Sequence, residues 1–306
     1  MTYAQYRKNL DVPTEPVDVI LDTDVSNEID DQFAIGYLLR CGERLRPVGL
    51  CSAPFTGMQG ITDPAQGADM TWRALQQVVT VAGREDLLER CYPGCRAYLP
   101  DEKTPVDSPA TRFMVETARR YSPEKPLYLV GIGVLTDIAS ALLMEPAIAE
   151  NVVIVWLGGH AQHLPRTDEF NMVQDIAAAR VVFDSPAPLV QLPCFGVVEQ
   201  FVTTRYELEH WLSGKGALAD YLCQLTVDEY RNEAVERPWS RSLWDVTAVA
   251  WLMNDGNRFM NADIRPAPVP EYDSRYAYDS TRKPMRYITA IRRDALFADM
   301  FRRLAE

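Results

Sequence analysis

The chain has 306 residues, of which 47% are hydrophobic, and a formal net charge of -12. This length and apolar content suit one large α/β domain or two smaller ones, and because nothing clearly marks a domain boundary, residues 1–306 are predicted to form a single domain. The acidic balance argues against nucleic acid as a partner, because phosphate binding requires clustered Lys and Arg. The sequence also has no apolar run of the ~20 residues that span a bilayer, and residues 1–15 lack the apolar core of a signal peptide. No membrane partner and a cytoplasmic location are therefore expected.

A dense group of carboxylates follows the first predicted strand. Residues 22–31 read DTDVSNEIDD, between an apolar run at 17–21 and an apolar helical segment. Carboxylates this close repel one another, so a compact fold tolerates them only if they are solvated, protonated or neutralised by a cation. A hard divalent ion with oxygen ligands is the economical solution. In the plainer alternative, Asp30 or Asp31 is a helix N-cap among solvated charges.

Further alternating strands and helices follow in chain order. Strands are predicted at 46–53, 127–132, 152–157 and 188–192, and helices at 64–82, 110–121, from 136 onward and at 175–184. The strands read as continuous apolar runs, which is typical of strands buried on both faces of a parallel sheet. Thr136 and Asp137 are a candidate N-cap pair, and residues 97–110 are expected to form an exposed loop. The predicted fold class is α/β, with a mostly parallel open sheet and helices on both faces.

The last third of the chain is predicted to be mainly helical. The expected elements are a helix over 206–235, an apolar helix at 246–253, a strand at 287–291 and an amphipathic C-terminal helix. Asp245 directly precedes the apolar helix and is a candidate N-cap. The six cysteines are scattered without paired C-x-x-C motifs, so reduced core thiols are expected rather than zinc ligands. Because loops after parallel strands lie along one sheet edge, residues 22–31, Thr56, 132–136 and 160–171 are expected to converge.

Four motifs occur in a characteristic order. The first is an apolar strand that runs into D-x-D, a turn and D-D, here Asp22, Asp24, Asp30 and Asp31. The second is Gly-Val-Leu-Thr-Asp-Ile-Ala at 133–139. The third is Gly-Gly at 158–159, then Glu-Phe-Asn at 169–171 and Ala-Arg-Val-Val-Phe at 179–183. The fourth, His-Asp before an apolar helix, is half present as Trp244 and Asp245. This ordered set, which covers most of the chain, resembles the calcium-dependent nucleoside hydrolases of the inosine/uridine type.

The resemblance implies a nucleoside-hydrolase-like fold, a Ca²⁺ cofactor and a small-molecule nucleoside substrate. The implied Ca²⁺ ligands are Asp24, Asp31 through both oxygens, the main-chain carbonyl of Ile132, and Asp245. Three carboxylates and a carbonyl, together with water and substrate hydroxyls, fill the roughly 6 to 8 oxygen positions that Ca²⁺ prefers. The resemblance also implies a homodimer or homotetramer.

The implied reaction is hydrolysis of the N-glycosidic bond of a ribonucleoside or related N-ribosyl compound, giving ribose and free base. Asp30 would be the general base that takes a proton from a Ca²⁺-bound water, and the sugar would pass through an oxocarbenium-like state. Glu169 and Asn171 would bind ribose hydroxyls, where an unpaired buried polar group enforces specificity. Thr56 and His163 stand where the family has asparagines that touch the sugar.

Two further departures from the family pattern concern the site. The turn between Asp24 and Asp30 is two residues longer, with Asn27 and Glu28 as the extra residues. Trp244 replaces the histidine that, in purine-cleaving members, is placed to protonate the departing base. Tryptophan has no proton to give at neutral pH.

Help for the leaving group must then come from other side chains or be unnecessary. His160 and His163 are candidate acids because histidine titrates near neutrality, although loop histidines are more often polar surface groups. Arg241 is a candidate for stabilising negative charge on the leaving base. Trp239 and Trp244 are candidates for stacking on a planar ring, with ordinary packing as the alternative.

Two other functions fit parts of the sequence. Residues 20–25 resemble the hydrophobic-D-x-D-x-V motif of haloacid-dehalogenase-like phosphatases, in which Asp22 would be the nucleophile. The chain has few lysines and no convincing G-D-x-x-x-D, and the Asp30–Asp31 pair would be left unexplained. A non-catalytic nucleoside- or ribose-binding protein is the other alternative, motivated by Trp244. The presence of Asp30 argues against it, because a binding protein needs no general base.

Overall fold

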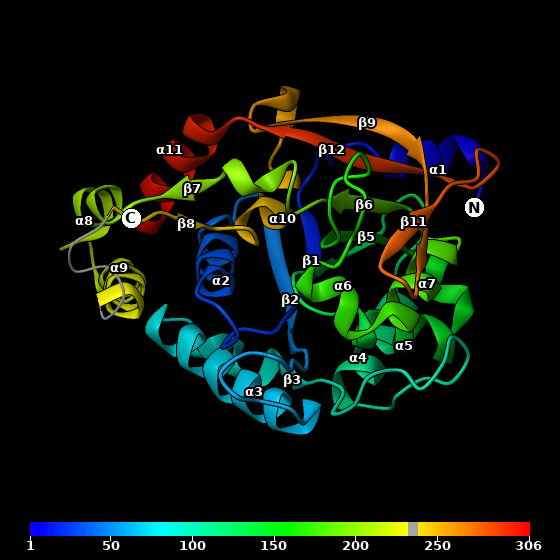
Figure 1. Ribbon diagram of the computed structural model, residues 1–306, viewed down its shortest axis with the longest axis horizontal. Helices are drawn as coiled ribbons and strands as arrows, with labels where there is room; N and C mark the ends of the chain where they lie inside the picture. Colours follow the sequence, from blue (N-terminus) through cyan, green and yellow to red (C-terminus); the bar gives the residue numbers. More distant parts are fainter. Residues whose placement is uncertain (232–237) are drawn as a thin grey trace.

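The computed structural model describes residues 1–231 and 238–306 and confirms the predicted fold class (Figure 1). Eight strands form one open sheet in the order β3-β2-β1-β4-β5-β6-β12-β9. These strands are β1 Val17–Thr23, β2 Leu45–Ser52, β3 Cys91–Pro93, β4 Leu127–Gly131, β5 Val152–Leu157, β6 Leu189–Leu192, β9 Met260–Pro266 and β12 Pro284–Ile291. Neighbouring strands in this sheet are parallel, except that β9 runs antiparallel to β12. The sequence did not predict β9, whose mixed burial as an edge strand gives it no apolar run.

The helices cover both faces of the sheet. They are α1 Tyr3–Asn9, α2 Asp30–Arg40, α3 Pro64–Val81, α4 Pro109–Ala118, α5 Thr136–Met144, α6 Phe170–Gln174, α7 Ile176–Asp184, α8 Arg205–Leu212, α9 Ala217–Arg231, α10 Val246–Trp251 and α11 Arg293–Leu304. Two small two-stranded sheets pair β10 Val269–Glu271 with β11 Arg275–Ala277 and β7 Val202–Thr203 with β8 Arg241–Ser242. Among the described residues, no helix is long and apolar enough to cross a membrane.

The helix predicted over 206–235 is in fact two helices, α8 and α9. The break between them contains Gly216, whose φ of +109° lies in a region that side chains rarely adopt, so a continuous helix cannot pass through it. Positions 232–235 of the prediction lie outside the described residues.

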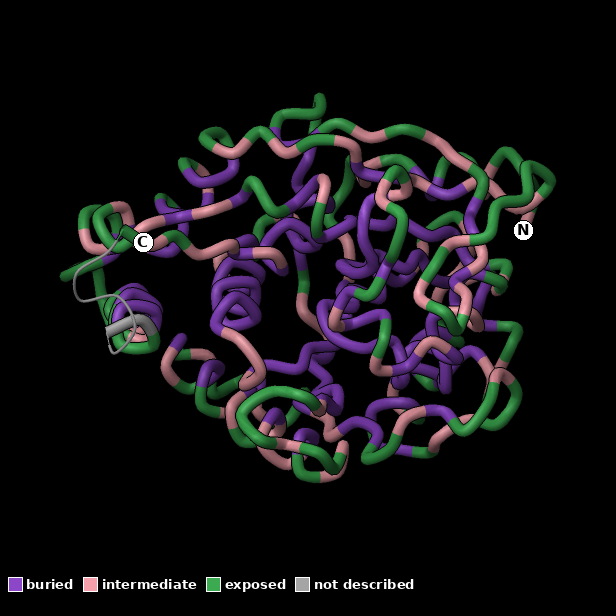
Figure 2. The backbone as a smooth tube through the Cα atoms, viewed as in Figure 1, coloured by how far each residue is buried: buried purple, intermediate pink, exposed green. Residues whose placement is uncertain are grey.

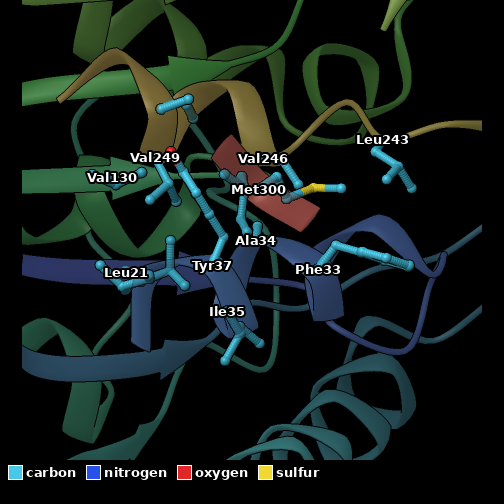
Figure 3. Packing of buried hydrophobic residues seen from close by; sticks show 14 of the residues in the cluster. Leu21, Phe33, Ala34, Ile35, Tyr37, Val130, Leu243, Val246, Val249 and Met300 are labelled. Atoms are coloured by element: carbon cyan, nitrogen blue, oxygen red, sulfur yellow. The ribbon is translucent and has the colours of Figure 1, made fainter. Parts of the chain in front are cut away.

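Strand β1 separates two hydrophobic cores. Val19 and Leu21 belong to the core that also contains side chains of α2, α10 and α11, whereas Ile20 belongs to the core with α4, α5 and α7. Successive side chains of a strand point to opposite faces of the sheet, so a continuous apolar run is the pattern that both cores require. Figure 2 shows the buried centre of the molecule, and Figure 3 shows side chains of β1, α2, α10 and α11 in the first core.

The strand order places the acidic loop at a reversal of the sheet. From β1 the chain proceeds to β2 on one side, and it later returns to form β4 on the other side of β1. The loops after β1 and β4 therefore diverge, which opens a crevice at the carboxyl ends of these strands, the usual position of binding sites in such sheets. Helix α2 begins at Asp30, directly after the loop, and is buried from Asp30 to Leu39.

The predicted N-cap pair of α5 is wrong. The N-cap residue is Leu135, and the two predicted caps bond to other segments instead. Thr136 donates from Oγ1 to Asp175 at 2.7 Å, and Asp137 accepts from the Cys95 N–H at 2.9 Å and the Ser108 hydroxyl at 3.0 Å. The Ser108 bond ties the end of the 97–110 segment to α5, and residues of this segment such as Asp101, Lys103 and Thr104 are exposed, as predicted. The six cysteines are buried and free, as expected.

Helix α3 packs directly on the backbone after β2, and Gly67 makes this possible. A Cβ at Gly67 would lie 2.0 Å from the carbonyl oxygen of Phe55 and 2.8 Å from its nitrogen. We expect Gly67→Ala to lower the free energy of unfolding by about 2 to 3 kcal/mol, because the overpacking outweighs the better helix propensity of alanine. Urea denaturation measures this change. Gly42→Ala is the control, since a Cβ there meets no atom within 4 Å, and an equal effect of both substitutions would contradict the prediction.

Candidate active site

One cavity of about 310 Å³ lies at the carboxyl edge of the sheet. Its lining comes from the loops after β1, β4, β5 and β6, the start of α2 and the segment before α10. The lining residues are Asp24, Asn27, Glu28, Asp30, Asp31, Ile132, Leu157, His160, Asp168, Glu169, Phe170, Asn171, Cys194, Phe195, Arg241, Trp244 and Asp245. The predicted convergence is therefore observed for the loops after β1, β4 and β5, but Thr56 after β2 is not in the lining.

Three aspartates form a compact group in this cavity. Asp30, Asp31 and Asp245 each place one carboxylate oxygen within 4.8 Å of the others, and all three are buried. Asp30 and Asp31 form the first turn of α2, where the helix dipole favours negative charge. The N-cap of α2 is Ile29. Capping is therefore wrong for Asp30 and Asp31, whereas Asp245 is the N-cap residue of α10, as predicted, without a side-chain capping bond to described residues.

Burial leaves these carboxylates short of compensating charge. Desolvation raises the pKa of Asp31 and of Asp245 well above the usual range, and repulsion from neighbouring carboxylates adds to this. Asp24, also buried, behaves in the same way. Desolvation and the charge of Glu28 raise the pKa of Asp30 to about 7. When these buried carboxylates are ionised, nearby cationic side chains of the described residues do not neutralise them. Such a group of oxygen ligands fits a hard divalent cation such as Ca²⁺.

Hydrogen bonds hold the proposed ligands in place. Thr23 donates from Oγ1 to Asp31, and the main-chain N–H of Asp245 donates to Asp30 at 3.4 Å. The Asn171 side-chain amide donates to the carbonyl of Ile132 at 3.2 Å, and it also donates to the carbonyl of Leu157 at 3.1 Å. Asn171 therefore orients the carbonyl oxygen that the sequence suggested as a metal ligand.

Glu169 lines the cavity, and its carboxylate also accepts hydrogen bonds from the loop backbone. Its carboxylate accepts from the main-chain N–H groups of Gly159 at 2.8 Å, Asn171 at 2.9 Å and Met172 at 3.0 Å, and it is the N-cap of α6. Desolvation raises its pKa, whereas these three donors act in the opposite direction. The bonds fix the loop after β5, so substitution of Glu169 would disturb the shape of the cavity as well as any sugar contact.

The remaining lining is aromatic and carries one cation. The Phe195 ring lies 4.8 Å from the His160 ring and 5.5 Å from the Trp244 ring, which it meets edge to face at 88°. Arg241 pairs with Glu28 at 2.8 Å and approaches Asp30 at 4.0 Å. His160 is buried, its Nδ1 has no hydrogen-bond partner among the described residues, and desolvation lowers its pKa.

Comparison with known proteins identifies a protein family. The sequence model of the family described as inosine-uridine preferring nucleoside hydrolase matches residues 19–297. The chain belongs to this family.

Relatives are similar to this chain over part of its sequence. A probable uridine nucleosidase 2 from Arabidopsis thaliana is 30% identical over 149 residues, which cover 47% of this chain and 44% of the relative. A putative pyrimidine-specific ribonucleoside hydrolase, RihB, from Shigella boydii is 36% identical over 86 residues, or 27% of this chain and 35% of the relative. These alignments span less than half the length of either relative.

Solved structures extend the likeness over nearly the full chain. A plant nucleoside hydrolase, PpNRh1, superposes with a TM-score of 0.74 at 20% identity, covering 95% of this chain and 99% of the other. The type III effector XopQ, solved with adenosine diphosphate ribose, superposes with a TM-score of 0.70 at 16% identity, covering 100% and 99%. At these identities the likeness shows the nucleoside hydrolase fold.

Three residues singled out from the sequence lie outside the cavity lining of this family member. Thr56 is half-buried, donates from its main-chain N–H to Gln174 at 2.7 Å, and has its hydroxyl 3.0 Å from that of Tyr98. His163 is exposed, and Trp239 packs against the first hydrophobic core. The residues that the structure brings together are Asp24, Asp30, Asp31, Ile132, His160, Glu169, Asn171, Arg241, Trp244 and Asp245.

Asp22 also lies outside the lining, which argues against the phosphatase alternative. The side chain is 1% exposed, neither carboxylate oxygen has a hydrogen-bond partner among the described residues, and desolvation raises its pKa. A nucleophile must reach the substrate, and a carboxylate buried outside the cavity lining does not. Family membership supports the same conclusion.

Sequence reasoning missed several residues of the family site. Cys194 and Phe195 follow β6, and the rule that placed the other strand-end loops at this edge would have included them. Phe170 stands between Glu169 and Asn171 in a motif that the sequence already indicated. The other missed residues are Asn27, Leu157 and Asp168.

Proposed function

We propose that this protein hydrolyses the N-glycosidic bond of a ribonucleoside or a related N-ribosyl compound and releases ribose and the free base. The observation that carries the proposal is the buried group of Asp30, Asp31 and Asp245 in the cavity at the sheet reversal. Membership of the nucleoside hydrolase family supports it. The names of the relatives, a uridine nucleosidase and a pyrimidine-specific ribonucleoside hydrolase, point to the same reaction class.

The residues divide into metal ligands and a base. Asp24, Asp31, Asp245 and the carbonyl of Ile132 would hold Ca²⁺, which when bound supplies positive charge that acidifies a water and anchors ribose hydroxyls. Asp30, the buried carboxylate beside these ligands, takes a proton from the attacking water. Glu169 and Asn171 contribute to the sugar side of the cavity.

The charge of the cavity favours a nucleoside over a phosphorylated ligand. The described lining contains seven carboxylates, from Asp24, Glu28, Asp30, Asp31, Asp168, Glu169 and Asp245, and one guanidinium, from Arg241. Phosphate recognition requires clustered cations or free main-chain N–H groups. One divalent ion would leave the described lining negative, so a diphosphate such as that of adenosine diphosphate ribose, the ligand solved with XopQ, would be repelled.

Release of reducing sugar tests the proposal directly. Purine, pyrimidine and modified nucleosides are incubated with the protein and Ca²⁺, and the same reactions are repeated after chelation and after Ca²⁺ is added back. We expect ribose release from at least one nucleoside, a loss of roughly 100-fold or more on chelation, and recovery with Ca²⁺. Binding of nucleoside and Ca²⁺ without any release would instead support a non-catalytic binding protein.

A further inference from the structure

The cavity raises the question of how the departing base is stabilised. When the bond between C1′ and the base nitrogen breaks, the electron pair stays on the base. A general acid can protonate that base as it leaves, or fixed positive charge can stabilise it as an anion. These two solutions select different leaving groups, because only the first makes a weakly acidic base a good leaving group.

Neither Trp244 nor His160 is a good general acid. The Trp244 indole N–H donates hydrogen bonds but does not ionise near neutrality. His160 is buried beside Phe195, and its desolvated ring disfavours the charged form that would give up a proton. The three rings of His160, Phe195 and Trp244 instead form an apolar wall against which a planar base can pack.

Arg241 offers the other solution. It is the only Lys or Arg among the described lining residues, and its side chain is 14% exposed. The guanidinium lies 4.0 Å from Asp30, the proposed base, in the same cavity that the aromatic wall lines. Glu28, in the turn after β1, pairs with it at 2.8 Å. Arginine stays charged at any physiological pH, so its stabilisation requires no proton transfer.

We propose that Arg241 stabilises a leaving group that departs as an anion. This rests on the proposed hydrolase function. In the reaction, the C1′–N bond breaks with both electrons going to the base, and the oxygen of a water forms the new bond to C1′. The water proton goes to Asp30, and the base anion takes up a proton from solvent after release.

Three ribonucleosides of nearly equal shape test the proposal: 5-fluorouridine, uridine and 5-methyluridine, in decreasing order of acidity of the free base. We expect kcat of the wild-type enzyme to fall steeply along this series. Arg241→Gln should lower kcat for uridine by roughly 100-fold, with a smaller loss for 5-fluorouridine and a larger loss for 5-methyluridine. Arg241→Lys keeps the charge and should lose less than about tenfold.

Two variants separate charge stabilisation from a structural role of the ion pair. Glu28→Gln removes the partner but leaves the arginine charge, so the steep dependence of kcat on base acidity should remain. Arg166→Gln removes an exposed arginine of the loop after β5 that is outside the lining, and kcat should not change. Trp244→His adds a group able to donate a proton and should flatten the dependence on base acidity.

The outcomes distinguish this proposal from the function on which it rests. Equal losses on all three nucleosides in Arg241→Gln, or the same acidity-dependent losses in Glu28→Gln, would make Arg241 a positioning residue and overturn the proposal. A wild-type rate that is independent of base acidity would overturn it as well. Absence of ribose release from every nucleoside would overturn the hydrolase function itself, and this proposal with it.

Discussion

Asp30→Asn is expected to lower kcat by about 10² to 10⁴-fold while nucleoside binding is preserved. Asparagine has nearly the same shape as aspartate, but its amide cannot accept the proton of the attacking water. Asp30 lies in the lining with a pKa raised to about 7, and it accepts a hydrogen bond from the Asp245 main chain at 3.4 Å, which the asparagine oxygen can retain. Ribose release at saturating nucleoside and Ca²⁺ gives kcat, and calorimetry of the same variant gives nucleoside affinity.

Asp24→Asn provides the matched comparison. Asp24 is an equally buried carboxylate in the same lining, proposed as a metal ligand. Its substitution should weaken Ca²⁺ binding, and higher Ca²⁺ should restore much of the rate, whereas no Ca²⁺ concentration should restore Asp30→Asn. If Asp30→Asn keeps its rate and Asp24→Asn loses it even at saturating Ca²⁺, the role of base belongs to Asp24 and the present assignment is wrong.

Ca²⁺ is expected to stabilise the folded protein, and to do so more strongly at pH 8 than at pH 5. Burial raises the pKa of Asp30 from 3.8 to about 7, so between about pH 4 and pH 7 the calcium-free folded protein holds a proton that the unfolded chain has released. Folding takes up protons in this window, and the stability of the calcium-free protein therefore falls as pH rises through it. The Asp30 difference alone corresponds to on the order of 4 kcal/mol.

Bound Ca²⁺ removes this penalty because it compensates the ionised carboxylates. The free energy of unfolding, measured by urea denaturation with Ca²⁺ and with chelator at several pH values, gives the difference directly. Asp30→Asn is the control, since the calcium-free variant should be less destabilised by rising pH than the wild type. A calcium-free wild type that gains stability between pH 5 and pH 7 would contradict the charge distribution described for this cavity.

The local sequence pattern was enough to predict those elements whose environment is set by the residues next to them in the chain. The strands β4 and β5 are buried on both faces, and their continuous apolar runs identified them. The acidic loop between β1 and α2 was equally clear, because five carboxylates beside a buried strand require compensation wherever the rest of the chain lies. Edge strand β9 and the break before α9 were not predicted, since their sequences lack a strong apolar period.

The sequence by itself determined the α/β class, the order of the family motifs and the carboxylates that face one cavity. Only the tertiary structure decided which side chains meet there. It placed Arg241 beside Glu28 and Asp30, added Phe195 from the loop after β6, and showed that Thr56 and His163 lie outside the lining. It also showed that Asp137 anchors a distant loop rather than capping its own helix. The physical reason is that motifs fix spacing along the chain, whereas contacts between segments far apart in sequence depend on how the helices pack on the sheet.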